Sequence, residues 1–258
     1  MLGKRVARSE SRSPAPSTMQ GMQTRHRLLA VLASLTLATA LIAGCSFSSS
    51  NNSGPLPDGT TLVKQSADAS KDLKSAHLVL TVIGKIPNLP VRNLTGDLST
   101  NPTAAQGNAQ ITYLGQDISA DFVVVGGDLY TNALNPGDKT MTDVGPASQV
   151  YDPSAILSPD AGLPNVLANF TDAKSEGRDQ ISGQSTVRIS GNVSADAVNK
   201  IASTFKANKP VPATVWIVES GDHQLAQISL QYSQGNNVQM TLSNWNKPVQ
   251  ITKPAASS

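Results

Sequence analysis

Between Leu225 and Leu242 the chain reads LAQISLQYSQGNNVQMTL, and apolar and polar side chains alternate on both sides of a turn. Successive side chains of a β-strand point to opposite faces of a sheet, so this alternation gives each strand one apolar and one polar face. Gly235-Asn236-Asn237 supplies the residues that tight hairpin turns favour. The stretch therefore predicts an antiparallel hairpin with one buried face, formed on its apolar side by Ala226, Ile228, Leu230, Tyr232, Val238, Met240 and Leu242.

Similar short segments, separated by turn residues, extend this pattern toward the N-terminus. Further strands are expected at residues 77–83, 91–98, 107–113, 118–125, 129–131, 174–180, 186–191 and 213–218. Helical spacing of apolar residues covers 62–76 and 195–205, and Ser194 is a suitable N-cap for the second helix. Prolines between residues 146 and 170 favour short, interrupted helices. The sequence thus predicts a single α+β domain over residues 57–258, with helices packed on the apolar face of a curved antiparallel sheet.

Residues 1–44 have the features of an export signal. Arg25 and Arg27 precede an uncharged run from residue 28 to residue 42, which is short for a membrane-spanning helix of roughly 20 residues. The run ends in Leu41-Ile42-Ala43-Gly44-Cys45, a pattern that resembles the bacterial lipobox. We expect cleavage before Cys45, lipidation of that cysteine, and a flexible tether over residues 45–56. The alternative is a plain transmembrane anchor, which is disfavoured because no cluster of charges follows the run.

The start of the chain leaves a second alternative open. The residues before Met22 are rich in Ser, Pro and Arg and look like an N-terminal extension upstream of the true start. Met1, Met19 and Met22 are all possible initiators. We expect the exported protein to be held on the outer face of the cell membrane by its lipid, with release to the cell wall or the medium also possible.

Charge and cysteine content narrow the classes of function. Six Lys and Arg residues and one acidic residue precede Cys45, so the 20 basic and 18 acidic residues of the whole chain leave 14 and 17 after it. A formal charge of −3 on the exported part argues against nucleic-acid binding. The chain has 1 cysteine, so the domain is expected to fold by burial of apolar surface without a disulfide.

Residue patterns for catalysis are missing from the sequence. His77 and His223 are the histidines after Cys45, and neither has partners at the spacing of a metal site. There is no G-x-S-x-G elbow and no phosphate-binding glycine loop. We therefore expect no enzyme activity, no catalytic residue, no metal and no cofactor.

The apolar face of the sheet is the remaining candidate for a functional surface. If short helices cover a curved sheet incompletely, an apolar cavity remains that could bind acyl chains, at about 0.8 kcal/mol per buried methylene. Taken singly, each residue on this face would more often belong to an ordinary core than contact a lipid. The candidates for lipid contact are Leu78, Leu80, Val82, Ala109, Ile111, Tyr113, Phe122, Val124, Leu163, Val166, Leu167 and Phe170.

Several motifs resemble the mycobacterial LppX/LprG lipoprotein family over nearly the whole exported chain. Besides the lipobox they are SAHLVLTV (75–82), GKIP (84–87), GDL (96–98), VYDP (150–153), NVLANF (165–170), PVPATVWI (210–217) and GDHQLAQ (221–227). The resemblance implies a half-barrel sheet with helices on its concave side, similar to the lipoprotein carriers LolA and LolB. It also implies binding of the acyl chains of triacylated glycolipids, such as lipoarabinomannan, lipomannan and phosphatidylinositol mannosides, and of triacylglycerol.

The same resemblance implies partners and a route. The implied transport partner is a major-facilitator efflux transporter, and the implied route carries lipid across the periplasm toward the outer envelope. The resemblance also implies that the host's Toll-like receptor 2 recognises the acyl groups. Two other hypotheses remain beside the lipid carrier. One is a structural or interaction lipoprotein whose sheet is solidly packed, and the other is an envelope hydrolase, for which the sequence offers no nucleophile.

Overall fold

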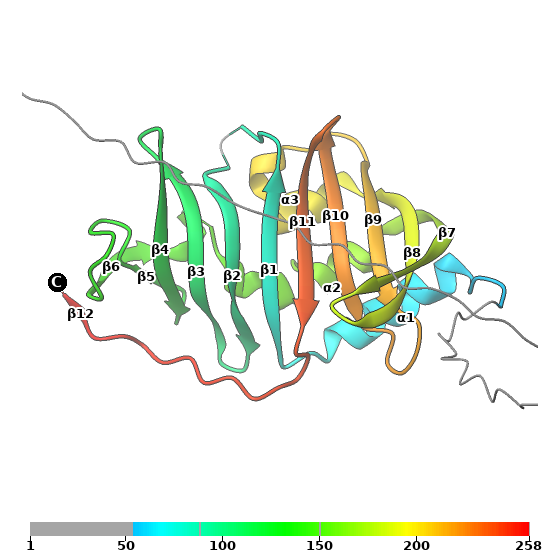
Figure 1. Cartoon of the computed structure of the whole chain (residues 1–258), viewed down its shortest axis with the longest axis horizontal. Coiled ribbons are helices and arrows are strands. Elements are labelled where there is room, and N and C mark those ends of the chain that lie inside the picture. Colours follow the sequence, from blue (N-terminus) through cyan, green and yellow to red (C-terminus); the bar gives the residue numbers. More distant parts are fainter. Residues whose placement is uncertain (1–53, 88, 150, 258) are drawn as a thin grey trace, which may run out of the picture. The chain divides into compact units, whose positions relative to one another are not determined.

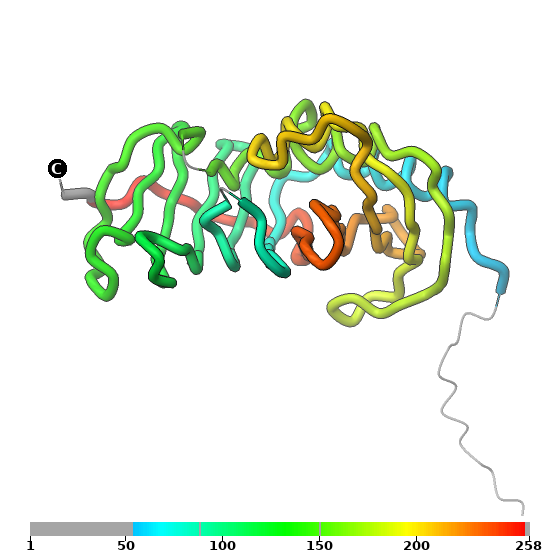
Figure 2. The backbone as a smooth tube through the Cα atoms, turned by 90° about the horizontal axis from the view of Figure 1, so that it is seen from above, coloured from blue at the N-terminus to red at the C-terminus, as the bar shows by residue number. Residues whose placement is uncertain are grey.

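The computed structural model describes residues 54–257 except 88 and 150, and the described residues belong to one compact unit. The predicted export signal, Cys45 and most of the predicted tether lie outside the described residues. One curved, open sheet dominates the domain, and the helices gather on one side of it (Figures 1 and 2). The strands are β1 (Ser75–Ile83), β2 (Val91–Thr100), β3 (Thr103–Tyr113), β4 (Gln116–Val125), β5 (Asp128–Thr131), β6 (Met141–Pro146), β7 (Phe170–Ile181), β8 (Gln184–Val193), β9 (Val211–Val218), β10 (Leu225–Ser233), β11 (Asn236–Ser243) and β12 (Ala256–Ser257).

The sheet consists of two meanders that meet in its middle. Its order is β12-β6-β5-β4-β3-β2-β1-β11-β10-β9-β8-β7, so β1 to β6 form one half and β7 to β11 form the other. β1 joins the halves by pairing with β11, and every pairing is antiparallel except that of β12 with β6. The predicted fold class, an α+β domain with a curved antiparallel sheet, is confirmed.

The C-terminal hairpin has the predicted register. Ile228 pairs with Met240 and Leu230 with Val238, and all four side chains are buried on the same face. Their polar neighbours alternate onto the opposite face, where Gln227 accepts hydrogen bonds from Gln239 (3.3 Å) and Thr241 (3.0 Å). Alternation along the strands therefore determines which face of the sheet the helices cover.

The helices are short and lie mainly over the second meander. They are α1 (Gly59–Lys71), η1 (Ala147–Gln149), η2 (Pro153–Leu157), α2 (Leu163–Ala168), α3 (Ala195–Ile201) and η3 (Ser203–Phe205). α1 contacts α2 and β7, and α2 also contacts α3, whereas η2 contacts β2 and β3. The two halves of the sheet are thus covered differently. Within the described ranges, no helix is both long and apolar enough to cross a membrane.

Several predicted boundaries were wrong. The first helix ends at Lys71, and Ala76, which fitted the helical spacing, lies in β1. The helix after Ser194 is capped as predicted, since Ser194 Oγ accepts from Ala197 N at 3.3 Å, but it ends at Ile201 and η3 follows. Phe170, predicted to lie in the covering segment, begins β7 and packs over Gly191. The alternation pattern indicated neither β6 nor β12.

Candidate functional site

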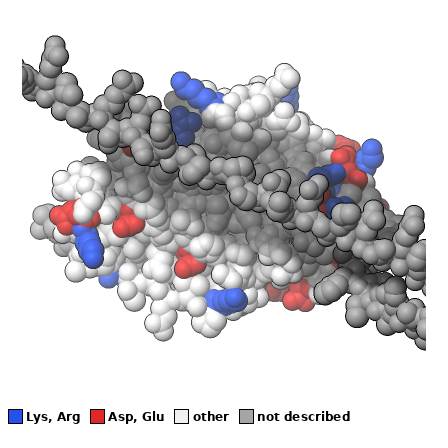
Figure 3. All heavy atoms as spheres, viewed as in Figure 1, with Lys and Arg blue, Asp and Glu red and all other residues white. Residues whose placement is uncertain are grey.

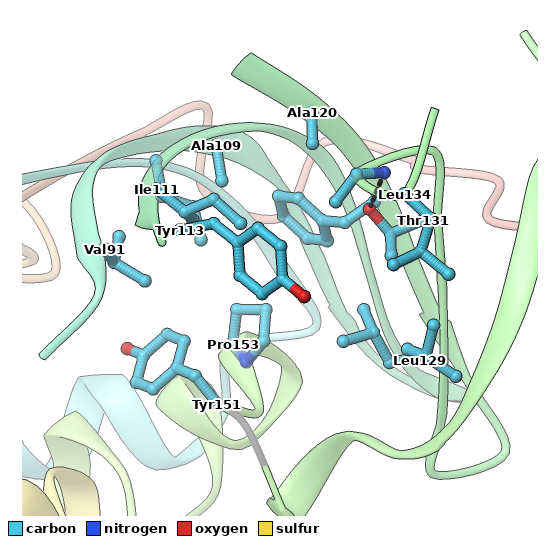
Figure 4. A pocket seen from close by; sticks show the side chains of 14 residues that line it. Val91, Ala109, Ile111, Tyr113, Ala120, Leu129, Thr131, Leu134, Tyr151 and Pro153 are labelled. Carbon is cyan, nitrogen blue, oxygen red and sulfur yellow. Dashed lines mark hydrogen bonds between the residues drawn. The ribbon is translucent and has the colours of Figure 1, made fainter. Parts of the chain in front are cut away.

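An apolar cavity of about 230 Å³ lies under the first meander, where helical cover is thinnest. Strands β2 to β6 form its floor and walls, and the segment from Tyr151 to Pro153 closes it from the opposite side (Figure 4). Pro153 begins the short 3₁₀ helix that covers the strands, a position that proline tolerates. The lining residues are Val91, Leu94, Ala109, Ile111, Tyr113, Ala120, Phe122, Leu129, Thr131, Ala133, Leu134, Val144, Tyr151 and Pro153.

The side chains that line this cavity carry few polar atoms and no charge. One of these polar atoms is the hydroxyl oxygen of Thr131, and it already takes part in two hydrogen bonds. It donates to the Asp121 carbonyl oxygen (2.8 Å) and accepts from Ala133 N (3.1 Å). The remaining polar atoms of these side chains are the hydroxyls of Tyr113 and Tyr151. Such a surface suits a hydrocarbon chain, because nearly all of its area gains from losing water.

The cavity opens to the outside through apolar residues. Three of its lining residues are exposed at the surface, namely Tyr113 (53%), Leu134 (58%) and Val144 (37%). Leu114, at the tip of the β3–β4 hairpin beside Tyr113, is 87% exposed. The apolar lining therefore continues to the surface of the domain, and this opening is called the mouth below.

A second, smaller apolar space of about 20 Å³ adjoins the cavity on the side of α3 and η3. Val91 and Tyr151 line both spaces and form the wall between them. The other lining residues are Leu80, Leu89, Ile201, Ala202, Phe205, Leu230, Val238 and Met240. The helical cover of the second meander thus leaves little free volume there.

The candidates for lipid contact fall into three groups. Four of them, all on β3 and β4, line the cavity: Ala109, Ile111, Tyr113 and Phe122. Leu80 lines the smaller space. The other candidates line neither space: Leu78, Val124, Leu163, Val166 and Leu167 are buried in the core, and Val82 and Phe170 pack against it partly buried. A contact with lipid remains a prediction for all of them.

Sequence reasoning missed the residues that close the cavity. Three of them lie where the alternation is too short to identify a face of the sheet: Leu129 on β5, Leu134 in the following loop and Val144 on β6. Tyr151 and Pro153 lie in the proline-rich segment and carried no periodic signal. The motif VYDP contains both of them, and it was the signal that could have pointed to this wall.

The opposite face of the sheet is polar. His77 Nδ1 lies 2.7 Å from Asp97 Oδ1, and Asn108 donates to Asp121 (2.9 Å). Among the described residues, no three His, Cys, Asp or Glu side chains gather in a way that could hold a metal ion. Where Figure 3 leaves this face visible, acidic and basic side chains are scattered or lie near one another. These groups form local pairs that keep the outer face in water.

Comparison with known proteins gives consistent matches. The model of the LppX_LprAFG lipoprotein family matches residues 58–251. The lipoarabinomannan carrier protein LprG of Mycobacterium leprae is 63% identical over 93% of this chain and 100% of its own length. The protein of the same name from Mycolicibacterium smegmatis is 53% identical over 91% of this chain and 100% of its own.

Two solved structures share the fold. The crystal structure of LprF from Mycobacterium bovis superposes with a TM-score of 0.69, at 31% identity over 78% of this chain and 99% of that one. The lipoprotein LppX of Mycobacterium tuberculosis gives a TM-score of 0.58, at 28% identity over 75% and 97% of the two chains.

Proposed function

Because the chain belongs to the LppX_LprAFG lipoprotein family, we propose that it is a lipid carrier that binds acyl chains in the cavity under its first meander. The observation that carries the proposal is an apolar cavity whose lining continues to the surface at an apolar mouth. Each methylene that leaves water contributes about 0.8 kcal/mol, so even part of an acyl chain would be held firmly.

The cargo we propose is an acylated glycolipid. Relatives at 53% and 63% identity bear the name lipoarabinomannan carrier protein. A lipoarabinomannan-type lipid, or a smaller triacylated relative, would bury acyl chains in the cavity and leave its sugars in water outside the mouth. Triacylglycerol fits the same requirement without a headgroup. The cavity offers no charged side chain for a headgroup, so recognition would rest on the chains.

The place of action we propose is the outer face of the cell membrane. Cleavage before Cys45 and lipidation of that residue would hold the domain there, and the proposed tether over residues 45–56 would let it reach both its lipid donor and its acceptor. Transfer toward the outer envelope, with a major-facilitator transporter as partner, follows from the family resemblance, as does recognition by Toll-like receptor 2. Carriage needs no chemical turnover, so we propose that the protein is not an enzyme.

The competing hypothesis, a structural lipoprotein without cargo, requires a solidly packed sheet. A cavity with an open mouth favours the carrier instead. The direct test is native mass spectrometry of a non-acylated version that begins after Cys45, purified from a mycobacterial host. Masses with bound acylated lipid are expected, and a clean apoprotein mass would contradict the proposal.

A pair of substitutions on one strand tests the location of the site. Ala109 lines the cavity on β3, so Ala109→Trp should fill it and abolish lipid loading. Gln110, the next residue, is exposed on the opposite face, so Gln110→Trp is the matched control and should load normally. Lipid content of both variants is measured by mass spectrometry, and folding by circular dichroism. Normal loading of a folded Ala109→Trp variant would mean that the lipid binds elsewhere.

A further inference from the structure

Tyr151 lies at the junction between the cavity and the smaller apolar space. Its side chain lines both, together with that of Val91. Figure 4 shows the hydroxyl of Tyr151 turned away from Pro153, on the side where Val91 lies. The phenol oxygen therefore lies on the side of the ring where the two spaces adjoin.

The side chain of Tyr151 is partly buried against the core, and its hydroxyl forms no hydrogen bond to another described residue. A lipid that fills the cavity would displace water from this hydroxyl, and a tyrosine hydroxyl that loses water needs another partner, because a buried polar group left unpaired is destabilising. Desolvation by the surrounding protein, with a smaller contribution from the Asp152 carboxylate, raises the pKa of Tyr151 well above its ordinary value. The group thus stays a neutral phenol that can donate.

Water is a poor partner for this hydroxyl on the inner side. The smaller space is about 20 Å³, room for roughly one water molecule, and a buried water requires about 2–4 polar partners. Apart from Tyr151, the side chains that line this space are all apolar. A donor surrounded by apolar surface is suited to an acceptor that arrives with an apolar ligand.

We propose that Tyr151 donates a hydrogen bond to an ester carbonyl of the bound lipid and so selects ester-linked acyl chains over plain hydrocarbon. This inference rests on the proposed lipid carriage and deepens it. An ester carbonyl accepts and does not donate, which complements a phenol O–H.

The role assigned to Tyr151 differs from simple packing in its consequence for specificity. A ring that only fills space would bind ester and ether lipids of equal chain length equally well. A donor matched to the carbonyl favours the ester, because the ether lacks that acceptor. A net hydrogen bond of ordinary strength predicts a preference of about fivefold.

The experiment compares two probes, trioleoylglycerol and its trialkyl ether analogue with the same chains. The full mature protein in detergent is offered both, and the occupancy of each is read by native mass spectrometry. The wild type should prefer the ester about fivefold, and Tyr151→Phe should bind both about equally, with its affinity for the ether unchanged. Ether binding also reports that the variant is folded.

Tyr232→Phe is the matched control. Tyr232 lines neither space, and its ring packs edge-on against Phe205 with centroids 5.4 Å apart. This variant should keep the wild-type preference. Equal binding of both probes by the wild type, or an unchanged preference in Tyr151→Phe, would overturn the role of Tyr151 while leaving lipid carriage intact. Failure of the wild type to bind either probe would overturn both proposals.

Discussion

Gly96 and Gly107 face each other across β2 and β3, where the two backbones approach closely. A Cβ added to Gly107 would lie 2.6 Å from Gly96 Cα and still closer to the Thr95 carbonyl oxygen. Neither neighbour is a flexible side chain that could move aside. Two single residues thus determine how tightly the strands that form the cavity floor can pack.

Gly107→Ala should therefore destabilise the domain by about 1–3 kcal/mol, the usual range for overpacking. Urea denaturation of both proteins measures the difference. Gln106→Ala, on the adjacent position of β3, adds no atom and is the control, with little change expected. Equal midpoints for Gly107→Ala and wild type would mean that the strands can separate without cost.

The raised pKa of Tyr151 also predicts that the stability of the domain depends on pH. Its pKa is raised in the folded protein by burial, whereas an unfolded phenol ionises at about pH 10. The neutral phenol is favoured in the folded state, so its contribution is complete below about pH 10 and is lost as the pH rises further. Between pH 9 and 11, the unfolding free energy of wild type should fall more than that of Tyr151→Phe. Parallel curves for the two proteins would contradict this.

At the scale of elements, alternation and length explain which predictions succeeded. Residues 225–242 alternate over two full strands, and both the hairpin and its buried face are as predicted. β12 has two residues, and β6 is broken by glycine and proline, so neither carries enough of a pattern to be identified. Their pairing depends on segments far apart in the chain, which local periodicity cannot reveal.

The candidate site illustrates the same limit. Alternation identified the apolar face, and four of the five candidates on β3 and β4 line the cavity, Val124 being the exception. Leu78 on β1 and the three candidates on α2 lie in the core and line neither space. Where the cover lies is decided by packing between α1, α2 and β7, and the pattern of a single strand contains no information on it.

The C-terminal segment is the element that closes one edge of the sheet. After β11 the chain is held at the start of β1, where Asn246 N donates to the Ser75 carbonyl oxygen (2.9 Å), and it then runs to β6 (Figure 1). There β12 pairs with β6, and the Lys253 ammonium lies 5.1 Å from the centroid of the Tyr130 ring. Unpaired edges template association between chains, and β12 covers part of the edge of β6 against such pairing.

Removal of residues 253–258 should expose the edge of β6 and the ring of Tyr130, which is now 1% exposed. We expect self-association that increases with concentration, measured by size-exclusion chromatography with light scattering. Lys253→Gln removes the cation and keeps the backbone pairing, so it should remain monomeric. A monomeric truncated protein would show that the edge of β6 is harmless without β12.

At the scale of the whole molecule, the N-terminal end of the described chain is fixed far from the cavity. Arg178 on β7 donates to both carboxylate oxygens of Glu219 (2.8–3.0 Å) and to the carbonyl oxygens of Gly54 (2.9 Å) and Pro55 (3.1 Å). Ser175 Oγ donates to the Pro57 carbonyl oxygen at 2.6 Å. The chain therefore joins the domain at the β7 edge of the sheet.

Arg178→Ala should release residues 54–57 from this edge while leaving the cavity unchanged. The backbone amide hydrogen of Leu56 would then exchange with solvent several times faster, as followed by hydrogen–deuterium exchange and mass spectrometry. Lipid loading should equal that of wild type, because Arg178 lies on the other half of the sheet. Unchanged exchange would mean that Ser175 and the start of α1 suffice to hold the segment.

The order of the strands places this attachment point far from the mouth of the cavity. Eight intervals separate β7 from β4, about 38 Å along the sheet at roughly 4.8 Å per interval. If the chain is anchored through Cys45, a small rotation about Gly54 sweeps the mouth through a wide arc, while the cavity keeps its shape. Loading and delivery could then differ only in the tilt of a rigid body, which fluorescent labels on Leu114 and Leu56 would report as a change in their heights above the bilayer.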